Sequence, residues 1–271
     1  MKFDSNLAWK QAAASVSANR EVLLAMAGVF FLLPGLALNL FMPQPVLSTD
    51  MGEEAAAAVM RDYYLSILPF AIPMALVQAA GTLGMLTLFT DRSRPTVGQA
   101  IRQGVAGILP YLLSQLILGF GIGIAGGVLL AIGMITGSMA LRTFAIAAAV
   151  LLALCAAIRS SLTAPVIAVE GERNPIAALK RSWQLTKGNS LRIALFYFLV
   201  LLAFAIVITA LMAVLGAVLA FMLAAKEREM VIMLFSSVLG TGVTLYFVAI
   251  LAAIHRQLAG PSPEAASALF E

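Results

Sequence analysis

Few side chains in this sequence are of the types that carry out catalysis or bind metals. The chain has one histidine, His255, and one cysteine, Cys155. Protein zinc sites use several His, Cys or carboxylate ligands, and a single cysteine has no partner for an intrachain disulfide. The sequence shows no pair of carboxylates on a shared helix face and no nucleophile motif. We therefore expect a protein that is not an enzyme and that holds no metal or cofactor.

A group of polar and charged residues between positions 159 and 183 is better suited to binding than to catalysis. It begins with an arginine and two serines that interrupt an apolar run, and it ends in a basic segment with one tryptophan. Its members are Arg159, Ser160, Ser161, Glu170, Lys180, Arg181 and Trp183. Basic side chains beside a tryptophan suit the headgroup level of an anionic leaflet, so the group predicts a headgroup-binding pocket. The alternative is an ordinary interfacial helix end.

A glycine-rich segment at 121–126 matches the G-x-G-x-x-G pattern of dinucleotide-binding folds. That pattern requires a strand before it and a helix after it, whereas here it lies inside a long apolar run. We therefore reject the cofactor interpretation. Gly119, Gly123 and Gly127 recur every four residues in the same region. Small residues at this spacing share one helix face, and they predict close packing against another helix.

The composition defines the elements that must position these residues. Of the 271 residues, 62% are hydrophobic and 11% are charged, and the mean hydropathy is +0.99. Soluble domains are about 45–50% apolar and about 25% charged, so a soluble globular domain and a disordered chain are excluded. A membrane-spanning helix needs about 20 apolar residues. We predict an all-α, multi-pass membrane protein with a single integral membrane domain over 1–271 and six spans, near 22–42, 63–89, 105–133, 142–169, 191–223 and 230–254.

The basic residues are distributed unequally between the two sides of these predicted spans. Of the 17 Lys and Arg residues, thirteen fall on the side that carries both termini, and the other four are Arg61, Arg142, Lys226 and Arg228. Cytoplasmic segments carry the excess of Lys and Arg. We therefore expect a bacterial inner-membrane protein with both termini in the cytoplasm.

Three segments on the predicted cytoplasmic side resemble one another. They begin Ala8-Trp9-Lys10-Gln11, Ala100-Ile101-Arg102-Gln103 and Ala178-Leu179-Lys180-Arg181. Each is preceded by residues that start helices, namely Asp4 and Ser5, then Pro95 and Thr96 with Gln99, then Asn174 and Pro175. The pattern predicts short interfacial helices, and it favours a unit of one interfacial helix plus one transmembrane hairpin that occurs three times. Coincidence is the alternative, because the matching segments are short.

The segment from Pro165 to Gly188 is similar to the hallmark segment of the glycerophosphoryl diester phosphodiesterase membrane-domain family and related uncharacterised bacterial inner-membrane proteins. The matching residues are Pro165, Glu170, Pro175, Ala178, Leu179, Arg181, Ser182, Trp183, Thr186, Lys187 and Gly188. The resemblance implies a multi-helix membrane domain that is sometimes fused to a soluble phosphodiesterase barrel. This chain has no room for that barrel and only one histidine, so the resemblance does not extend to hydrolase activity.

Two functions are compatible with these features. The first is a non-enzymatic, lipid-associated membrane module that engages anionic headgroups at the cytoplasmic face. The alternative is a transporter or flippase-like carrier of a lipid or small amphiphile.

Asn39, Gln78 and Gln115 are uncharged polar residues deeper in the spans, where hydrogen bonds between helices are their default use. A cavity that reaches Gln78 or Gln115 would favour the carrier, and a dry bundle would favour the module. Membrane lipids are the expected partners, and nucleic acid is not expected to bind.

Overall fold

The computed structural model describes residues 2–42, 45, 47–48, 50–90, 96–135 and 137–260, and all regular structure in these residues is helical. The elements in chain order are α1 (Ser5–Ala18), α2 (Arg20–Ala27), the π-helix η1 (Gly28–Leu32), α3 (Leu33–Phe41), α4 (Glu53–Thr90), α5 (Val97–Ile135), α6 (Met139–Ser160), α7 (Thr163–Val169), α8 (Pro175–Thr186), α9 (Ser190–Met222) and α10 (Ala225–Ala259).

The described residues contain six helical segments that are long and apolar enough to cross a membrane. They are Arg20–Phe41, Glu53–Phe89, Val97–Ile135, Met139–Val169, Ser190–Met222 and Ala225–Ala259. Each overlaps one predicted span, so the all-α, six-span prediction is confirmed. Several of these helices are longer than the roughly 20 residues needed to cross the hydrocarbon, and they can tilt or extend beyond it.

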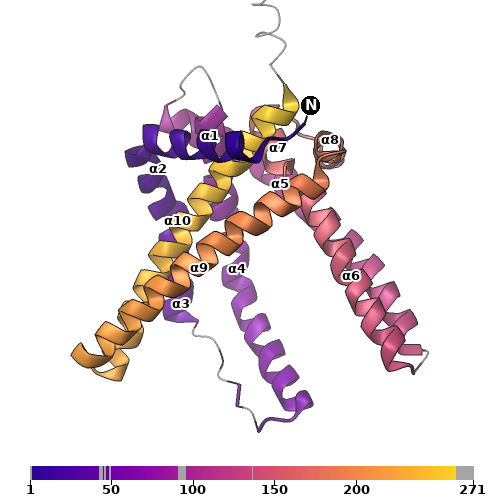
Figure 1. Cartoon of the computed structure of the whole chain (residues 1–271), viewed down its shortest axis with the longest axis vertical. Coiled ribbons are helices and arrows are strands. Elements are labelled where there is room, and N and C mark those ends of the chain that lie inside the picture. The colour runs from indigo at the N-terminus through magenta and orange to yellow at the C-terminus, as the bar shows by residue number, and fades with distance from the viewer. Residues whose placement is uncertain are drawn as a thin grey trace, which may run out of the picture.

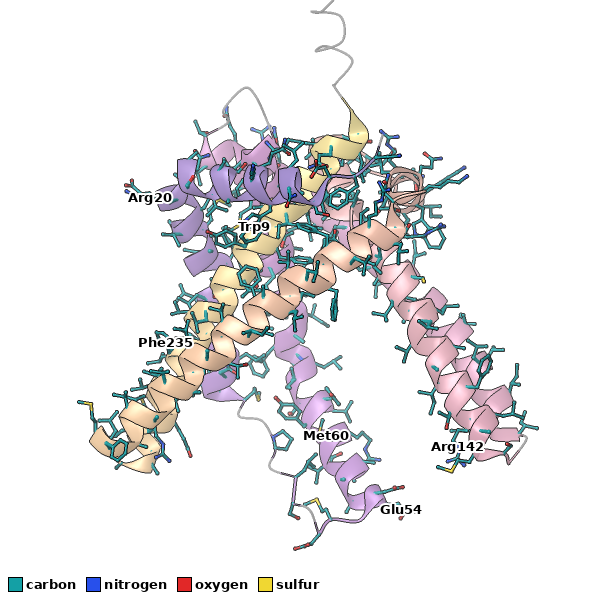
Figure 2. The ribbon with its side chains drawn as sticks, viewed as in Figure 1. Trp9, Arg20, Glu54, Met60, Arg142 and Phe235 are labelled. Atoms are coloured by element: carbon teal, nitrogen blue, oxygen red, sulfur yellow. The ribbon has the colours of Figure 1, made fainter. Side chains whose placement is uncertain are left out.

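The spans converge at one end of the molecule and separate at the other (Figure 1). We call the first the packed end; it contains α1, α7, α8 and the adjoining ends of the spans. We call the second the splayed end; it contains the α5–α6 and α9–α10 turns and the start of α4. α5 and α6 pack side by side, whereas α9 and α10 meet at their turn and diverge towards the packed end, and the start of α4 stands apart from the other helices. Trp9 and Arg20 lie towards the packed end, and Glu54 and Arg142 lie at the splayed end (Figure 2).

The two ends of the described chain meet at the packed end. The backbone N–H of Asp4 donates to Gln257 Oε1 at 3.2 Å, and Gln257 Nε2 donates to the Asp4 carbonyl at 3.2 Å. Trp9 of α1 stacks on Tyr246 of α10, with ring centroids 6.0 Å apart and planes inclined by 19°. These contacts hold α1 across α10, so both ends of the described chain lie at the same end of the helical spans, as an even number of crossings requires.

The predicted helix-start residues do cap helices at the packed end. Asp4 accepts a hydrogen bond from the Leu7 N–H at 3.0 Å, which caps α1. Asn174 accepts from the N–H groups of Ile176 and Ala177 at 2.9 and 3.2 Å, which caps α8. These bonds satisfy backbone donors that a helix N-terminus otherwise leaves without partners. Beyond the end of α8, Gly188 has a φ of +80°, a conformation that glycine adopts without strain.

The second predicted interfacial helix is not separate from its span. Thr96 and Gln99 form the expected reciprocal capping box, with backbone-to-side-chain distances of 2.9 and 3.3 Å, but α5 then continues unbroken from Val97 to Ile135. Gly104 and Gly107 lie where the two parts meet, but both are buried against neighbouring helices, and the helix continues through them. Pro95, Arg92 and Arg94 lie outside the described residues. The repeat keeps one shared feature, because Ala8, Ala100 and Ala178 are all completely buried.

The fourth span is two helices rather than one. α6 ends at Ser160 and α7 begins at Thr163, whereas the sequence predicted continuous helix over 142–169. The Ser160–Ser161 pair and Pro165 explain the break, since hydroxyl side chains compete for backbone hydrogen bonds and proline removes one. α7 is buried against α4 and α5, so the break turns the chain into the packed end.

Within the part of the chain that the structure describes, no helix packs closely against the predicted glycine stripe. A Cβ atom built on Gly119, Gly123 or Gly127 would meet no atom within 4 Å. Close contact occurs instead at Gly104, where a Cβ would lie 2.7 Å from the Gly84 backbone nitrogen. Spacing alone identifies a smooth helix face, but it does not say whether a second helix covers that face.

Candidate functional site

A carboxylate at the packed end joins three elements. Glu170, directly after α7, accepts a hydrogen bond from Arg181 Nε of α8, with 2.9 Å between Nε and Oε2. Its other oxygen, Oε1, lies 2.9 Å from Nε2 of His255 in α10. The His255 side chain is only 3% exposed. Glu170 therefore holds together α7, α8 and the last span.

The electrostatics of Glu170 follow from this position. Burial by itself raises the pKa of the carboxyl, because it disfavours the charged form. The hydrogen bonds with His255 and Arg181 and the charge of the Arg181 guanidinium act in the opposite direction and outweigh burial, so the pKa of Glu170 lies below its ordinary value. The carboxylate is thus ionised and acts as a structural anion at neutral pH.

A second set of contacts closes the break between α6 and α7. The Arg159 guanidinium lies 5.3 Å from the centroid of the Trp183 ring, and Trp183 Nε1 donates to Ser160 Oγ at 2.9 Å. Ser182 Oγ donates to the Arg159 carbonyl at 2.7 Å and accepts from the Leu162 N–H at 3.1 Å. These bonds use backbone groups that the break releases from the helix ladder.

The structure brings most of the predicted headgroup set together. The Ser161 hydroxyl accepts from the Tyr197 hydroxyl of α9 at 3.1 Å, and Lys180 is exposed on α8. The Arg181 Nε–H, however, is already bonded to Glu170, and the Trp183 Nε1–H is bonded to Ser160. Of the predicted set, Lys180 and the guanidinium of Arg159 are the cationic groups best placed to meet a ligand.

Sequence reasoning missed His255, Ser182 and Tyr197 in this network. The signal for His255 was its place at the end of the sixth span, on the same side of the membrane as Glu170 at the end of the fourth. A lone histidine and a lone carboxylate at the same depth are candidates for a pair. Among the described residues, no group of three or more His, Cys, Asp and Glu side chains is arranged to hold a metal ion.

A separate polar cavity of about 590 Å³ lies among the spans. Its walls come from η1, α3, α4, α5 and α10. The lining residues are Phe31, Leu32, Gly35, Asn39, Ala75, Gln78, Ala79, Thr82, Tyr111, Leu112, Gln115, Ser237, Gly240, Thr241 and Thr244. All three deep polar residues that the sequence singled out, Asn39, Gln78 and Gln115, therefore line one space. Gln115 is near the middle of the 39-residue helix α5, which places the cavity well inside a span.

The hydrogen bonds of the cavity wall are local. The side chains of Tyr111 and Gln115, one turn apart on α5, share a hydrogen bond. Asn39 and Gln78 have no side-chain hydrogen bond to any other residue that the structure describes. The expected hydrogen bonds between spans are thus not made by these two amides, which leaves their donors and acceptors available to a ligand.

An apolar groove of about 240 Å³ lies against the same helix pair, α3 and α4. Its walls are the side chains of Pro34, Ala37, Leu38, Phe41, Met42, Phe70, Pro73, Met74 and Val77. No residue lines both spaces, so the polar cavity and the apolar groove use different faces of α3 and of α4.

The fold and these sites define a class of protein: a multi-pass membrane protein with six spans, a packed end and a polar cavity between its helices. The chain belongs to the family described as a domain of unknown function, DUF7847, whose model matches residues 8–258. No curated protein sequence and no solved structure matches the chain.

Proposed function

We propose that this protein is a non-enzymatic carrier that takes an amphiphile, either a lipid or a smaller molecule, from the bilayer into the polar cavity between α3, α4, α5 and α10. The observation that carries the proposal is the cavity of about 590 Å³ that contains both Gln78 and Gln115. A dry bundle, packed by small residues, would instead have favoured the lipid-associated module.

The cost of exposed polar groups supports this proposal. Transfer of an amide from water to an apolar environment without a hydrogen-bond partner costs roughly 2–7 kcal/mol of free energy, depending on the reference state. Asn39 is exposed near the end of α3 and Gln78 is partly exposed on α4, and their amides have no side-chain hydrogen bond among the described residues, so they are open to water or to a polar ligand. A ligand with polar and apolar parts would satisfy the amides and remain soluble in the surrounding lipid.

Headgroup binding at the packed end is a second proposal, independent of the cavity. Arg159 above the Trp183 ring, with Lys180 exposed nearby on α8, supports it. In that arrangement the packed end faces the cytoplasm of a bacterial inner membrane, where anionic lipids attract basic segments. The likeness of residues 165–188 to the phosphodiesterase membrane-domain family supports kinship with that family, without its hydrolase activity.

The cavity proposal is tested by native mass spectrometry of the purified full chain, extracted from its membrane in a mild detergent. We expect a retained amphiphile of defined mass, and we expect Gln78→Leu and Gln115→Leu to reduce its occupancy. The matched control is Gln103→Leu, because Gln103 is exposed on α5 and does not line the cavity. An equal loss in the control, or no retained amphiphile in the parent protein, would contradict the proposal.

A further inference from the structure

We propose that the ligand of the polar cavity is an amphiphile with an uncharged, hydroxyl-bearing head and one acyl chain, with the chain seated in the apolar groove between α3 and α4. This inference rests on the proposed function and adds the chemical class of the ligand. Three observations carry it: the charge of the cavity wall, the direction of its hydrogen bonds, and the position of the groove.

The first observation concerns charge. None of the described residues that line the cavity is Asp, Glu, Lys, Arg or His. A phosphate or carboxylate head would enter a site of low dielectric constant without a cation, and the desolvation of an unpaired buried charge is far more costly than that of a hydroxyl group. The wall therefore selects against ionic heads, in contrast to the packed end, where basic side chains are available.

The second observation concerns hydrogen-bond donors on α10. Its three hydroxyl side chains in the wall all donate to carbonyls of their own helix. Ser237 donates to Met233 at 2.8 Å, Thr241 to Ser237 at 2.8 Å, and Thr244 to Gly240 at 3.0 Å. Each hydroxyl has one donor and two acceptor lone pairs, so these three offer the cavity acceptors only. A ligand must bring O–H or N–H donors to this wall. A phosphate dianion has no O–H donor and a monoanion has few, so an ionised phosphate head suits this wall poorly.

Two other side chains of the lining complement this pattern. The amides of Asn39 on α3 and Gln78 on α4 each provide both donors and acceptors to the same cavity. A polyol such as a glycerol head can donate to the α10 hydroxyl oxygens and exchange both kinds of bond with the amides. The lining therefore offers partners to both the O–H donors and the oxygen acceptors of such a head.

The third observation is the apolar groove on the α3–α4 pair. Gly35 and Asn39, four residues apart, face the polar cavity, while Pro34 and Leu38, also four apart, line the groove. The π-helix η1 directly precedes α3 and contributes Phe31 and Leu32 to the cavity. A π-helix changes the rotation per residue and recurs at functional sites, and here it precedes the helix that carries Asn39. A molecule that enters between α3 and α4 can place its head in the cavity and its chain in the groove.

The test uses two probes that share one acyl chain and differ only in the head: monooleoylglycerol and oleoyl lysophosphatidic acid. Each is titrated into the delipidated full chain in a non-ionic detergent, and the bound fraction is measured by native mass spectrometry. We expect monooleoylglycerol to bind at least about tenfold more tightly than the phosphate form, which corresponds to about 1.4 kcal/mol. Equal binding, or tighter binding of the phosphate form, would overturn the inference.

Two variants locate each part of the ligand. Thr241→Val removes one acceptor from the α10 wall with little change in shape, and it should weaken monooleoylglycerol binding several-fold. Met74→Trp fills the apolar groove, and it should weaken the oleoyl compound more than a short-chain monoacylglycerol. The control is Gln103→Leu, which should leave both affinities unchanged. Unchanged affinity in Thr241→Val, or equal effects of Met74→Trp on both chain lengths, would overturn the assigned pose.

The outcomes separate this inference from the proposed function. If neither probe binds and no amphiphile is retained from the membrane, the carrier proposal fails together with the inference. If both probes bind equally and the Gln78→Leu variant weakens both, the cavity binds amphiphiles, but the selection of an uncharged head is wrong. Melting temperatures within error of the parent value show that a loss of binding is not a loss of folding.

Discussion

The packed end and the splayed end hold their helices in different ways. At the packed end, a buried cluster of apolar side chains that includes Leu83, Ile167 and Ile250 packs the helices together, and polar contacts such as those of Glu170 join α7, α8 and α10. At the splayed end, the hairpins separate and large apolar side chains face outwards; Phe221 is 93% exposed and Ile135 is 85% exposed. In a bilayer, lipid tails are as apolar as leucine, so hydrophobicity does not draw helices together. Shape and hydrogen bonding decide where these helices meet.

The ion pairs of the two regions show the same contrast. Glu170 is partly buried and bound by Arg181 and His255, side chains that come from two other helices. Arg61 and Asp62 near the splayed end also form a pair, at 3.3 Å, but both side chains are 70% exposed and are neighbours in the sequence. A pair between helices fixes an arrangement, whereas an exposed pair between neighbours fixes none.

The largest expected difference between the two ends is the side of the membrane that each faces. A reporter fused to the C-terminus should behave as cytoplasmic, because thirteen of the 17 Lys and Arg residues lie on the side that carries both termini. A reporter inserted in the α5–α6 turn should behave as periplasmic. Active periplasmic reporter at the C-terminus would show that the packed end faces outwards.

The next largest effect should come from enlarging a glycine at the packed end. In Gly104→Leu, the new Cβ would lie 2.7 Å from the Gly84 nitrogen and 2.8 Å from the Ala80 carbonyl oxygen. Backbone atoms cannot yield as a flexible side chain can, so α4 and α5 must separate. We expect a loss of stability at or above the upper end of the usual 1–3 kcal/mol for overpacking, that is, about 3 kcal/mol or more. Thermal unfolding in detergent measures it.

The matched control is Gly123→Leu on the same helix. A side chain there meets no atom within 4 Å, so the melting temperature should not fall. A fall as large as that of Gly104→Leu would mean that the exposed glycine face is covered in the native protein, and the contrast between the two regions would need revision.

An intermediate effect should follow from neutralising the carboxylate at the packed end. Glu170→Gln leaves Arg181 and the nearly buried His255 without their anion, and we expect a loss of about 2 kcal/mol. Asp62→Asn is the comparison at the other end, where the exposed pair should contribute nothing measurable. Equal melting temperatures for both variants would show that Glu170 does not stabilise the packing of α7, α8 and α10.

The same carboxylate should give the packed end a dependence on pH. The pKa of Glu170 is lowered in the folded protein, so its stabilising contribution is present above the unfolded pKa and is lost as pH falls through the folded pKa. The parent melting temperature should therefore fall as pH decreases from about 5 to about 3, around the ordinary glutamate pKa of about 4.3. Glu170→Gln should flatten this part of the profile. A profile of unchanged slope would assign the acid sensitivity to other groups.

Sequence patterns predicted the parts of the fold that depend on local physics. The six spans follow from lengths of apolar sequence, and the caps at Asp4 and Asn174 follow from hydrogen bonds within one turn. The glycine stripe at Gly119, Gly123 and Gly127 was predicted to pack closely and does not, because that outcome depends on which helix lies opposite.

The candidate sites were predictable to different degrees for the same reason. Asn39, Gln78 and Gln115 were recognisable as polar residues inside spans, but their meeting in one cavity depends on how η1, α3, α4, α5 and α10 are arranged. The pairing of Glu170 with His255 joins positions 85 residues apart, and no local spacing encodes it. Arg159 and Trp183 do lie together, since the break after Ser160 and the short α8 bring them into contact, while their use as a headgroup site stays a prediction.

The smallest expected effect tests a single hydrogen bond at the packed end. The Tyr197 hydroxyl of α9 donates to Ser161 Oγ at 3.1 Å, which ties α9 to the break between α6 and α7. Tyr197→Phe keeps the ring and its packing, and it removes only this donor, so we expect a loss of about 1 kcal/mol. Tyr64→Phe near the splayed end is the matched control, because Tyr64 is 59% exposed and its hydroxyl joins no other helix among the described residues. Thermal unfolding of the two variants, measured side by side, should show a lower melting temperature only for Tyr197→Phe. If both variants melt at the parent temperature, the hydroxyl bond does not hold α9 in place, and ring packing against Phe247, with centroids 5.3 Å apart, is what attaches this helix.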